Sequence, residues 1–169
     1  MKKLTLLFVF ILGIILSGCS KKSDIDYMEI ANKSIKQNDI AQAVDSYKKL
    51  IEEYPHSPKA PEAMFQLATL YQNKLVKNMS ENESLEKAVN LFEQLNDVYP
   101  DSPMAPKALF MSGFILANDI HDFTRATQVF KTFLEKYPDN ELTSSAREEL
   151  NNMGMSPSEI LERQKATKI

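Results

Sequence analysis

The chain has 169 residues, of which 25% are charged, and its formal net charge is −3. Because nucleic-acid binding needs clustered Lys and Arg, this acidic balance argues against a nucleic-acid partner. Glycine is scarce at four residues, and the helix-forming residues Ala, Leu, Lys, Glu and Gln recur, so the composition favours an all-α protein.

Residues 1–18 have the organisation of an export signal. Two lysines follow the first Met, and the thirteen-residue apolar run after them is too short to span a bilayer as a mature helix. The run ends in Leu16-Ser17-Gly18-Cys19, which resembles the lipobox of bacterial lipoproteins. That resemblance implies that Cys19 is lipidated and becomes the new N-terminus. The alternative is an ordinary signal peptide that ends near a cysteine by chance.

A short polar linker, residues 19–23, follows the signal peptide. Cys19 is the only cysteine in the sequence and so has no intramolecular disulfide partner, whereas two or more acyl chains on it would anchor the protein stably. In the lipoproteins that this segment resembles, Ser20 in place of Asp implies sorting to the outer membrane. The four residues after Cys19 reach at most about 14 Å. We therefore expect the folded domain to lie against the periplasmic face of the outer membrane.

One pattern of apolar residues occurs three times in the rest of the chain. The copies are offset by 45 and then 38 residues, and their apolar residues fall at i, i+4, i+7 and i+11, which is one stripe of an α-helix. Each stripe ends in a Tyr-Pro pair, where a helix cannot continue. Each copy therefore predicts one amphipathic helix with an abrupt end. The copies are Ala43, Tyr47, Leu50 and Tyr54-Pro55; Ala88, Phe92, Leu95 and Tyr99-Pro100; and Ala126, Phe130, Phe133 and Tyr137-Pro138.

Small residues follow each Tyr-Pro pair at constant spacing. The residues nine positions after the tyrosine are Ala63, Ala108 and Ala146, and those fourteen positions after it are Ala68 and Gly113. The tetratricopeptide repeat has this pattern: a small residue in the first helix, then Ala at the start of the next helix. An aromatic residue lies four positions after that Ala, and Pro lies twelve positions after it. Residues 24–153 thus resemble tetratricopeptide proteins. The resemblance implies an all-α solenoid of antiparallel helix pairs with about three and a half repeats.

The predicted helices follow one another in pairs that are joined by short turns. The second pair carries about eight extra residues between its helices, around 76–84, which predicts an exposed loop. A final helix with a polar outer side is expected to close the array. The helices are expected at 24–37 and 40–54, at 59–78 and 85–99, and at 104–118 and 123–137, with the closing helix at 141–153.

The remaining residues, 154–169, form a tail. Ser156 and Glu159 have the spacing of a capping box, which predicts a short helix after Gly154. Either this helix packs on the last repeat or it extends as a docking peptide.

No arrangement of residues for catalysis or metal binding is evident in the sequence. The two histidines, His56 and His121, fall in predicted turns without the spacing of metal-ligand motifs, so we expect them to be exposed turn residues. There is neither a Gly-rich phosphate loop nor a Gly-x-Ser-x-Gly motif. The sequence therefore predicts a non-enzymatic protein with no cofactor and no metal.

The tetratricopeptide resemblance implies a surface for partners. In that fold the first helix of each pair lines a concave groove, and the residues on its inner side hold the ligand. Aromatic anchors bordered by amides would suit a peptide, because aromatic rings bury area and amides bond its backbone. The alternative is that Phe65 and Phe110 belong to the core. The groove positions carried onto this chain are Phe65, Thr69, Asn73, Phe110, Phe114 and Asn118, with Met28, Asn32, Ile35 and Gln72 beside them.

The stretches 54–63 and 133–139 resemble two groups of bacterial envelope proteins. One is the BamD family, lipoproteins that scaffold β-barrel assembly in the outer membrane, and the other is the periplasmic repeat protein of the Tol-Pal system. The lipobox and the short linker favour the first group. The resemblance implies a lipid-anchored scaffold whose partners are envelope proteins, including the barrel-assembly machinery. The alternatives are a protein that coordinates the Tol-Pal system or the cell wall, and a carrier lipoprotein for glycan or a small solute.

Overall fold

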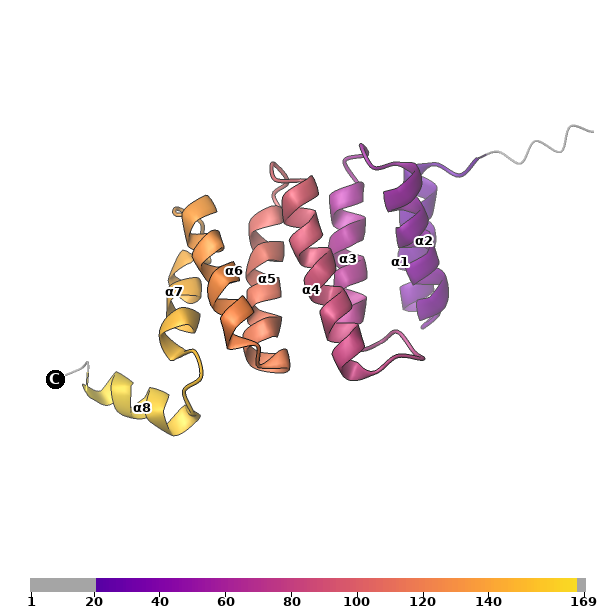
Figure 1. The fold of residues 1–169 in the computed structure, drawn as a ribbon. Coiled ribbons are helices and arrows are strands. Elements are labelled where there is room, and N and C mark those ends of the chain that lie inside the picture. Colours follow the sequence, from indigo (N-terminus) through magenta and orange to yellow (C-terminus); the bar gives the residue numbers. More distant parts are fainter. Residues whose placement is uncertain (1–20, 167–169) are drawn as a thin grey trace, which may run out of the picture.

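The computed structural model describes residues 21–166, and the predicted signal peptide, 1–18, and Cys19 lie outside them. The described residues form eight α-helices and one π-helical turn, η1 (Figure 1). The elements are α1 (Asp24–Lys36), α2 (Ile40–Glu53), α3 (Ala60–Gln72), α4 (Glu81–Val98), α5 (Ala105–Ile115), η1 (Leu116–Ile120), α6 (Phe123–Lys136), α7 (Thr143–Asn152) and α8 (Pro157–Ala166).

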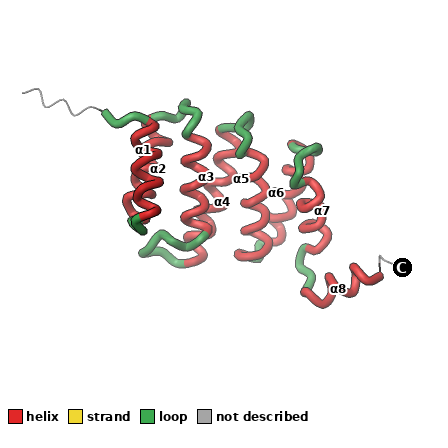
Figure 2. Tube along the Cα trace, turned by 180° about the vertical axis from the view of Figure 1, so that it is seen from behind, coloured by secondary structure: helices red, strands yellow, loops and turns green. Residues whose placement is uncertain are grey.

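Consecutive helices run antiparallel and stack side by side into one array (Figures 1 and 2). α1 packs on α2, α3 on α4 and α5 on α6, and each pair contacts the next through α2 with α3 and through α4 with α5. Between residues 21 and 166, no helix is long and apolar enough to cross a bilayer. The predicted all-α arrangement of helix pairs is confirmed.

The repeated apolar stripe is the core of the array. The nine residues at i, i+4 and i+7 of the three copies are completely buried, and the tyrosines at i+11 are half-buried. Each second helix turns this side towards its pair partner and the next pair, so the spacing seen in the sequence is the spacing of core positions. The nine residues are Ala43, Tyr47 and Leu50 in α2, Ala88, Phe92 and Leu95 in α4, and Ala126, Phe130 and Phe133 in α6.

The small residue of the third repeat permits a close contact between two helices. A Cβ atom on Gly113 of α5 would lie only 3.0 Å from the Phe130 ring of α6. That distance is shorter than an ordinary van der Waals contact, so a larger residue would push the ring away. The sequence signal of a small residue at this position therefore reflects helix packing.

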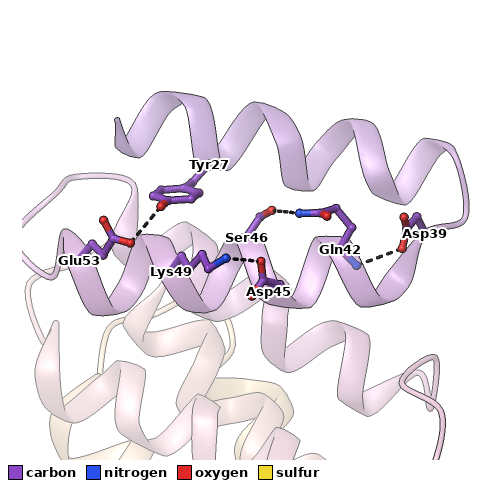
Figure 3. Close-up of polar contacts among 7 residues, drawn as sticks. All are labelled: Tyr27, Asp39, Gln42, Asp45, Ser46, Lys49 and Glu53. Atoms are coloured by element: carbon purple, nitrogen blue, oxygen red, sulfur yellow. Dashed lines mark hydrogen bonds and ion pairs between the residues drawn. The ribbon is translucent and has the colours of Figure 1, made fainter. Parts of the chain in front are cut away.

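Polar contacts within α2 and one between α1 and α2 stabilise the first helix pair (Figure 3). Asp39 caps α2 by accepting a 3.0 Å hydrogen bond from the Gln42 amide. At the other end of the pair, the hydroxyl of Tyr27 in α1 donates a 2.9 Å hydrogen bond to a carboxylate oxygen of Glu53 in α2. That bond raises the pKa of Tyr27 above its ordinary value, because the carboxylate binds the protonated hydroxyl.

The tyrosine that follows each second helix bonds to an earlier part of the chain. Each hydroxyl crosses to the neighbouring segment of the array, so the Tyr-Pro signal contributes polar contacts between neighbours as well as a helix stop. The bonds run from Tyr54 to the Lys22 carbonyl at 2.6 Å, from Tyr99 to the Pro55 carbonyl at 2.9 Å, and from Tyr137 to the Asn96 side-chain oxygen at 2.7 Å.

The predicted helix at 59–78 is wrong at its end, because α3 stops at Gln72. Lys74 adopts the left-handed conformation with φ of 57°. The Leu75 amide then donates to the Leu70 carbonyl at 3.1 Å, and the Lys74 amide donates to the Tyr71 carbonyl at 2.9 Å. This pair of bonds closes the last turn of a helix, and the chain turns without a glycine to mark the place.

The predicted helix at 85–99 is wrong at its start, because α4 begins at Glu81. Ser80 caps it by accepting a 3.1 Å hydrogen bond from the Glu83 amide, and Glu81 and Glu83 lie in its first turn. The buried hydroxyl of Ser84 donates to the Tyr71 carbonyl at 2.7 Å and so fixes this start of α4 on α3. The insertion is therefore a loop at 73–80 followed by an extra helical turn.

The predicted helix at 104–118 changes its hydrogen bonding before it ends. α5 stops at Ile115, and the chain continues through η1 to Ile120. His121 then adopts the left-handed conformation with φ of 62°. A π-turn holds more residues than an α-turn and interrupts the periodicity of the side chains, so Asn118 is rotated from the place that a continuous α-helix would give it.

The tail forms the predicted short helix, α8, which is directed away from the stack in Figures 1 and 2. Ser156 and Glu159 bond reciprocally, with the Ser156 amide donating at 2.7 Å and the Glu159 amide at 3.4 Å. Arg163 connects α8 to the end of α7 through a 2.5 Å bond to the Asn151 carbonyl. Leu161 remains 52% exposed. α8 is thus held by polar contacts, with an apolar side chain left in solvent.

Candidate protein-binding surfaces

The six predicted groove residues lie on the first helices of the second and third pairs. Phe65 and Thr69 are in α3, and Asn73 directly follows it. Phe110 and Phe114 are in α5, and Asn118 is in η1. The two helices are neighbours here, because the Lys107 ammonium of α5 lies 5.2 Å from the centre of the Phe65 ring. We call the surface made by these six residues the first-helix face.

Two of the aromatic residues of the first-helix face are partly core. The Phe65 ring packs edge-on against Phe92 with their centres 5.1 Å apart, and Phe110 does the same with Phe130 at 5.5 Å and Phe133 at 5.9 Å. Phe65 and Phe110 are nonetheless half-buried, not buried. Each ring therefore packs on the second helix of its own pair and keeps a part exposed.

Phe114 lies further from the core than Phe110. Its ring stacks on that of Phe110 with their centres 6.4 Å apart and their planes 24° apart, and it is half-buried. Asn118 is exposed one turn later, where its amide nitrogen donates to the Phe114 carbonyl at 3.1 Å and to a carboxylate oxygen of Glu149 at 3.4 Å. Phe114 and Asn118 thus form an aromatic–amide pair on the surface of the array.

The polar residues of α3 differ in what they offer to a partner. The Thr69 hydroxyl donates to the Phe65 carbonyl at 2.9 Å, so its proton is engaged within the helix. Asn73 is exposed at the C-cap of α3. The predicted correspondence of Asn73 with Asn118 therefore holds in exposure, although one residue ends an α-helix and the other lies within a π-turn.

A second surface, which the sequence reasoning missed, lies between α2 and α4 with α3 as its floor. It is a cavity of about 430 Å³, and we call it the α2–α4 groove. Ile51 and Leu91, both half-buried, are the apolar residues of its walls. The signal in the sequence was an apolar residue adjacent to the core stripe in each helix. The floor is Met64, Leu67 and Tyr71, and the remaining lining is Lys48, Glu52, Lys87, Asn90 and Gln94.

The equivalent space between α4 and α6 is polar. This α4–α6 groove has a volume of about 360 Å³ and is lined in part by Glu93, Asp97, Arg125 and Lys136. Burial raises the pKa of the Glu93 carboxyl, and the positive charge of Arg125 opposes that shift. Arg125 also donates two hydrogen bonds, at 2.9 and 3.1 Å, to the Glu86 carboxylate. The two grooves therefore have similar volumes and different charges along their walls.

The histidines lie where the sequence placed them, exposed in turns between helices. His121 follows η1, and its ring nitrogen lies 3.2 Å from the Ala117 carbonyl. It contributes to a cavity of about 500 Å³ that Asn118, Phe123, Met153 and the start of α8 also line. Among the described residues, no group of three or more His, Cys, Asp or Glu is placed to hold a metal ion.

Comparisons with known proteins agree with this architecture. The family model described as "YfiO: Outer membrane lipoprotein" matches residues 20–155. Among solved structures, the N-terminal domain of stress-induced protein-1 (STI-1) from C. elegans is similar to the chain with a TM-score of 0.58. The similarity covers 74% of this chain and 92% of that one at 22% identity, so it concerns the fold alone. No curated protein matches the sequence.

Proposed function

The chain belongs to the YfiO family of outer membrane lipoproteins, and from this we propose that it is a non-enzymatic scaffold that binds other proteins of the cell envelope. Family membership makes it a lipid-anchored protein of the outer membrane. Its fold is the tetratricopeptide-like array that the repeats predict. Such arrays expose long surfaces of consecutive helices, which suit extended protein partners.

The function within the envelope that we propose is the assembly of outer-membrane β-barrel proteins. The resemblance of 54–63 and 133–139 to the BamD family supports it, as does the predicted lipid anchor at Cys19, directly before the matched region. The partners are then the proteins of the barrel-assembly machinery, met at the periplasmic face of the membrane.

The observation that carries the proposal is the aromatic–amide pair of the first-helix face. Phe114 stacks on Phe110, which the core holds in place, and Asn118 lies exposed beside it. A half-buried ring on a rigid support loses little conformational entropy when a partner covers it, and the side-chain oxygen of Asn118, whose nitrogen donates within the array, can accept a hydrogen bond from a peptide backbone. We therefore assign the principal contact to Phe114 and Asn118, with Phe65, Thr69, Asn73 and Phe110 forming the rest of the surface.

Crosslinking in intact cells tests this assignment. A photoreactive amino acid replaces Phe114, and a matched variant carries it at Leu91, which is also half-buried and lines the α2–α4 groove. We expect position 114 to capture a barrel-assembly protein and position 91 to capture less of it. Capture from position 91 alone would move the contact to the α2–α4 groove.

Two further outcomes would contradict the function itself. If neither position captures an envelope protein, the chain is not a scaffold of the kind proposed. If the purified protein carries bound glycan or copurifies with a transporter, the carrier function replaces the scaffold. Capture of Tol-Pal components would assign the scaffold to that system instead.

A further inference from the structure

The linker joins the array at one particular edge. Residues 21–23 are the described part of the linker and precede α1. The turns that join one helix pair to the next lie on the same side of the array as this linker, at 54–59, 99–104 and 137–142 (Figures 1 and 2). We call this side the linker edge. The α1–α2 turn, the loop at 73–80 and η1 lie on the opposite edge.

Four contacts, made by Lys21, Lys22 and Ser23, hold the linker against the first helix pair. The Tyr54 hydroxyl donates a 2.6 Å hydrogen bond to the Lys22 carbonyl. The Lys21 ammonium lies 5.2 Å from the centre of the Tyr54 ring and 3.4 Å from the Glu53 carboxylate. Ser23 caps α1 and bonds reciprocally with Asp26. The chain is therefore joined to the folded array from Lys21 onwards.

The covalent distance from this point to the membrane anchor is short. Only Ser20 lies between Lys21 and Cys19. Two Cα–Cα steps span at most about 8 Å, so the acyl chains on Cys19 enter the bilayer within about one nanometre of Lys21. The anchor thus brings the bilayer to the linker edge and leaves the opposite edge at the far ends of the helices.

The linker edge carries exposed apolar side chains beside charged ones such as Lys59 and Asp101, whereas the exposed side of α1 is lined mainly by charged residues. Asp26, Glu29 and Lys33 are exposed along α1, and charged groups resist transfer from water into a bilayer interface. The linker edge carries the exposed apolar side chains of Ile25 and Val98, which are 57% and 53% exposed. A shallow groove beside Val98 is lined by Pro58, Pro61, Pro100 and Pro103.

We infer that the linker edge is a membrane-contacting surface, on which Ile25 and Val98 meet the phospholipid bilayer. The helix axes then point away from the membrane, and the opposite edge faces the periplasm. The inference rests on the lipid anchor at Cys19 and is independent of which protein binds the array.

Fluorescence quenching tests the orientation with matched exposed apolar positions. The full lipidated chain receives a single cysteine at one of four places, I25C or V98C on the linker edge and I35C or L75C on the opposite edge. Ile35 and Leu75 are 36% and 43% exposed, so all four labels start in solvent. Cys19 is acylated, so the introduced cysteine is the reactive thiol. The labelled proteins are placed in phosphatidylethanolamine–phosphatidylglycerol vesicles whose headgroups carry a quencher.

We expect loss of fluorescence at positions 25 and 98 and little loss at positions 35 and 75, which lie near the end of α1 and in the loop at 73–80. Along α1 alone, the ten residue steps from Ile25 to Ile35 span about 15 Å. Equal quenching at all four positions, or stronger quenching at 35 and 75, would overturn the inference. Failure of the protein to float with the vesicles would instead contradict the lipid anchor at Cys19. The crosslinking experiment tests the partner and not the anchor, so the two failures can be told apart.

A longer linker provides the control. Inserting about 20 Gly and Ser residues after Ser20 leaves the array unchanged but lets the anchor move several nanometres away. The difference between the two edges should then disappear. A difference that survives this insertion would contradict the role that we assign to the short, held linker.

Discussion

The hydroxyl of Tyr137 donates a 2.7 Å hydrogen bond to the side-chain oxygen of Asn96, which lies 41 residues earlier and is 2% exposed. Tyr137 directly follows α6, and Asn96 lies near the end of α4. The bond therefore connects the second helices of two neighbouring pairs. It also satisfies a buried acceptor that water cannot reach, which makes the tyrosine more than a helix-ending residue.

Replacing Tyr137 by Phe should destabilise the array. Loss of the hydroxyl leaves the Asn96 oxygen buried without its donor, which costs about 1–3 kcal/mol. The control is Tyr54→Phe, whose acceptor, the Lys22 carbonyl, is in an exposed region and can bond to water instead. Denaturant unfolding of both variants measures the difference. Equal losses of unfolding free energy would show that burial of the acceptor is not the cause.

Replacing Gly113 by Ala should also reduce stability, although alanine is the better helix former. The new Cβ would lie 3.0 Å from the buried Phe130 ring. Overpacking costs about 1–3 kcal/mol, and the gain in helix propensity is about 1 kcal/mol, so we expect a net loss of about 1 kcal/mol. Denaturant unfolding of Gly113→Ala, Phe130→Leu and the double variant measures the coupling of the two sites.

The double variant should lose less than the two single variants together, by about 0.5 kcal/mol or more, because the smaller side chain makes room for the methyl group. A Gly113→Ala protein that gains the full propensity of alanine would show that the ring moves freely and that helix approach does not require glycine.

The core of this fold was accessible from the sequence because each core position occurs three times. In a sequence, a single Phe that will be buried looks the same as one that will be exposed. Tyr47, Phe92 and Phe130, however, occupy equivalent places in three successive repeats, and all three are buried. Repetition converts a weak periodic signal into a prediction of helix pairing as well as of helices. The all-α array was predictable for that reason.

The bounds of the insertion were not predictable, because the turn that ends α3 lacks the usual residues. Lys74 takes the left-handed conformation although it is neither glycine nor asparagine, and Asn78 takes it four residues later at φ of 65°. Ser80 is one of several polar residues that could have capped α4, and only its contact with the Glu83 amide identifies it. The π-turn η1 has no sequence signal of its own, since its five residues are compatible with a continuous α-helix.

The candidate surface was predictable in position and not in chemistry. The resemblance to tetratricopeptide proteins located Phe65 and Phe110 on the first helices, but whether they were core or surface depended on contacts with Phe92 and Phe130. The structure makes them both, packed on one side and exposed on the other. The α2–α4 groove arises from residues of three helices, and no single stretch of sequence contains it.

Alkaline titration should destabilise the protein through Tyr47. Burial raises the pKa of Tyr47 to about 12. Because the folded pKa lies above the unfolded value of about 10, the folded state keeps a proton that the unfolded state loses between these values. The contribution of protonated Tyr47 to the free energy of unfolding is therefore complete below about pH 10 and is lost as the pH rises through about 12. At full ionisation the loss is about 2–3 kcal/mol. Unfolding free energies measured across this range in the wild type test it.

Tyr47→Phe is the control for that titration. Tyr27, Tyr99 and Tyr137 also have raised pKa values, so some decline in stability should remain in the variant. The decline should nonetheless be shallower than in the wild type. Identical curves for the two proteins would mean that the pKa of Tyr47 is the same in the folded and the unfolded state.

Phe114 and Phe110 should respond differently to replacement by Ala, which separates binding from folding. Phe110 packs on Phe130 and Phe133, so Phe110→Ala should cost about 2–4 kcal/mol of stability. Phe114 contacts Phe110 at the surface, so Phe114→Ala should change stability less. It should weaken the affinity for the captured partner by about 30-fold, or about 2 kcal/mol. Binding to the purified partner and thermal unfolding are measured on the same samples.

Leu91→Ala is the matched control, because Leu91 is also half-buried but lies in the α2–α4 groove. It should leave partner affinity unchanged if the first-helix face makes the contact. Unchanged affinity in the Phe114→Ala protein, with a loss in the Leu91→Ala protein, would transfer the binding site to the α2–α4 groove. Each variant truncates one half-buried apolar side chain, Phe114 in α5 or Leu91 in α4. A difference in affinity between the two variants therefore reports the place of the contact and not a general loss of packing.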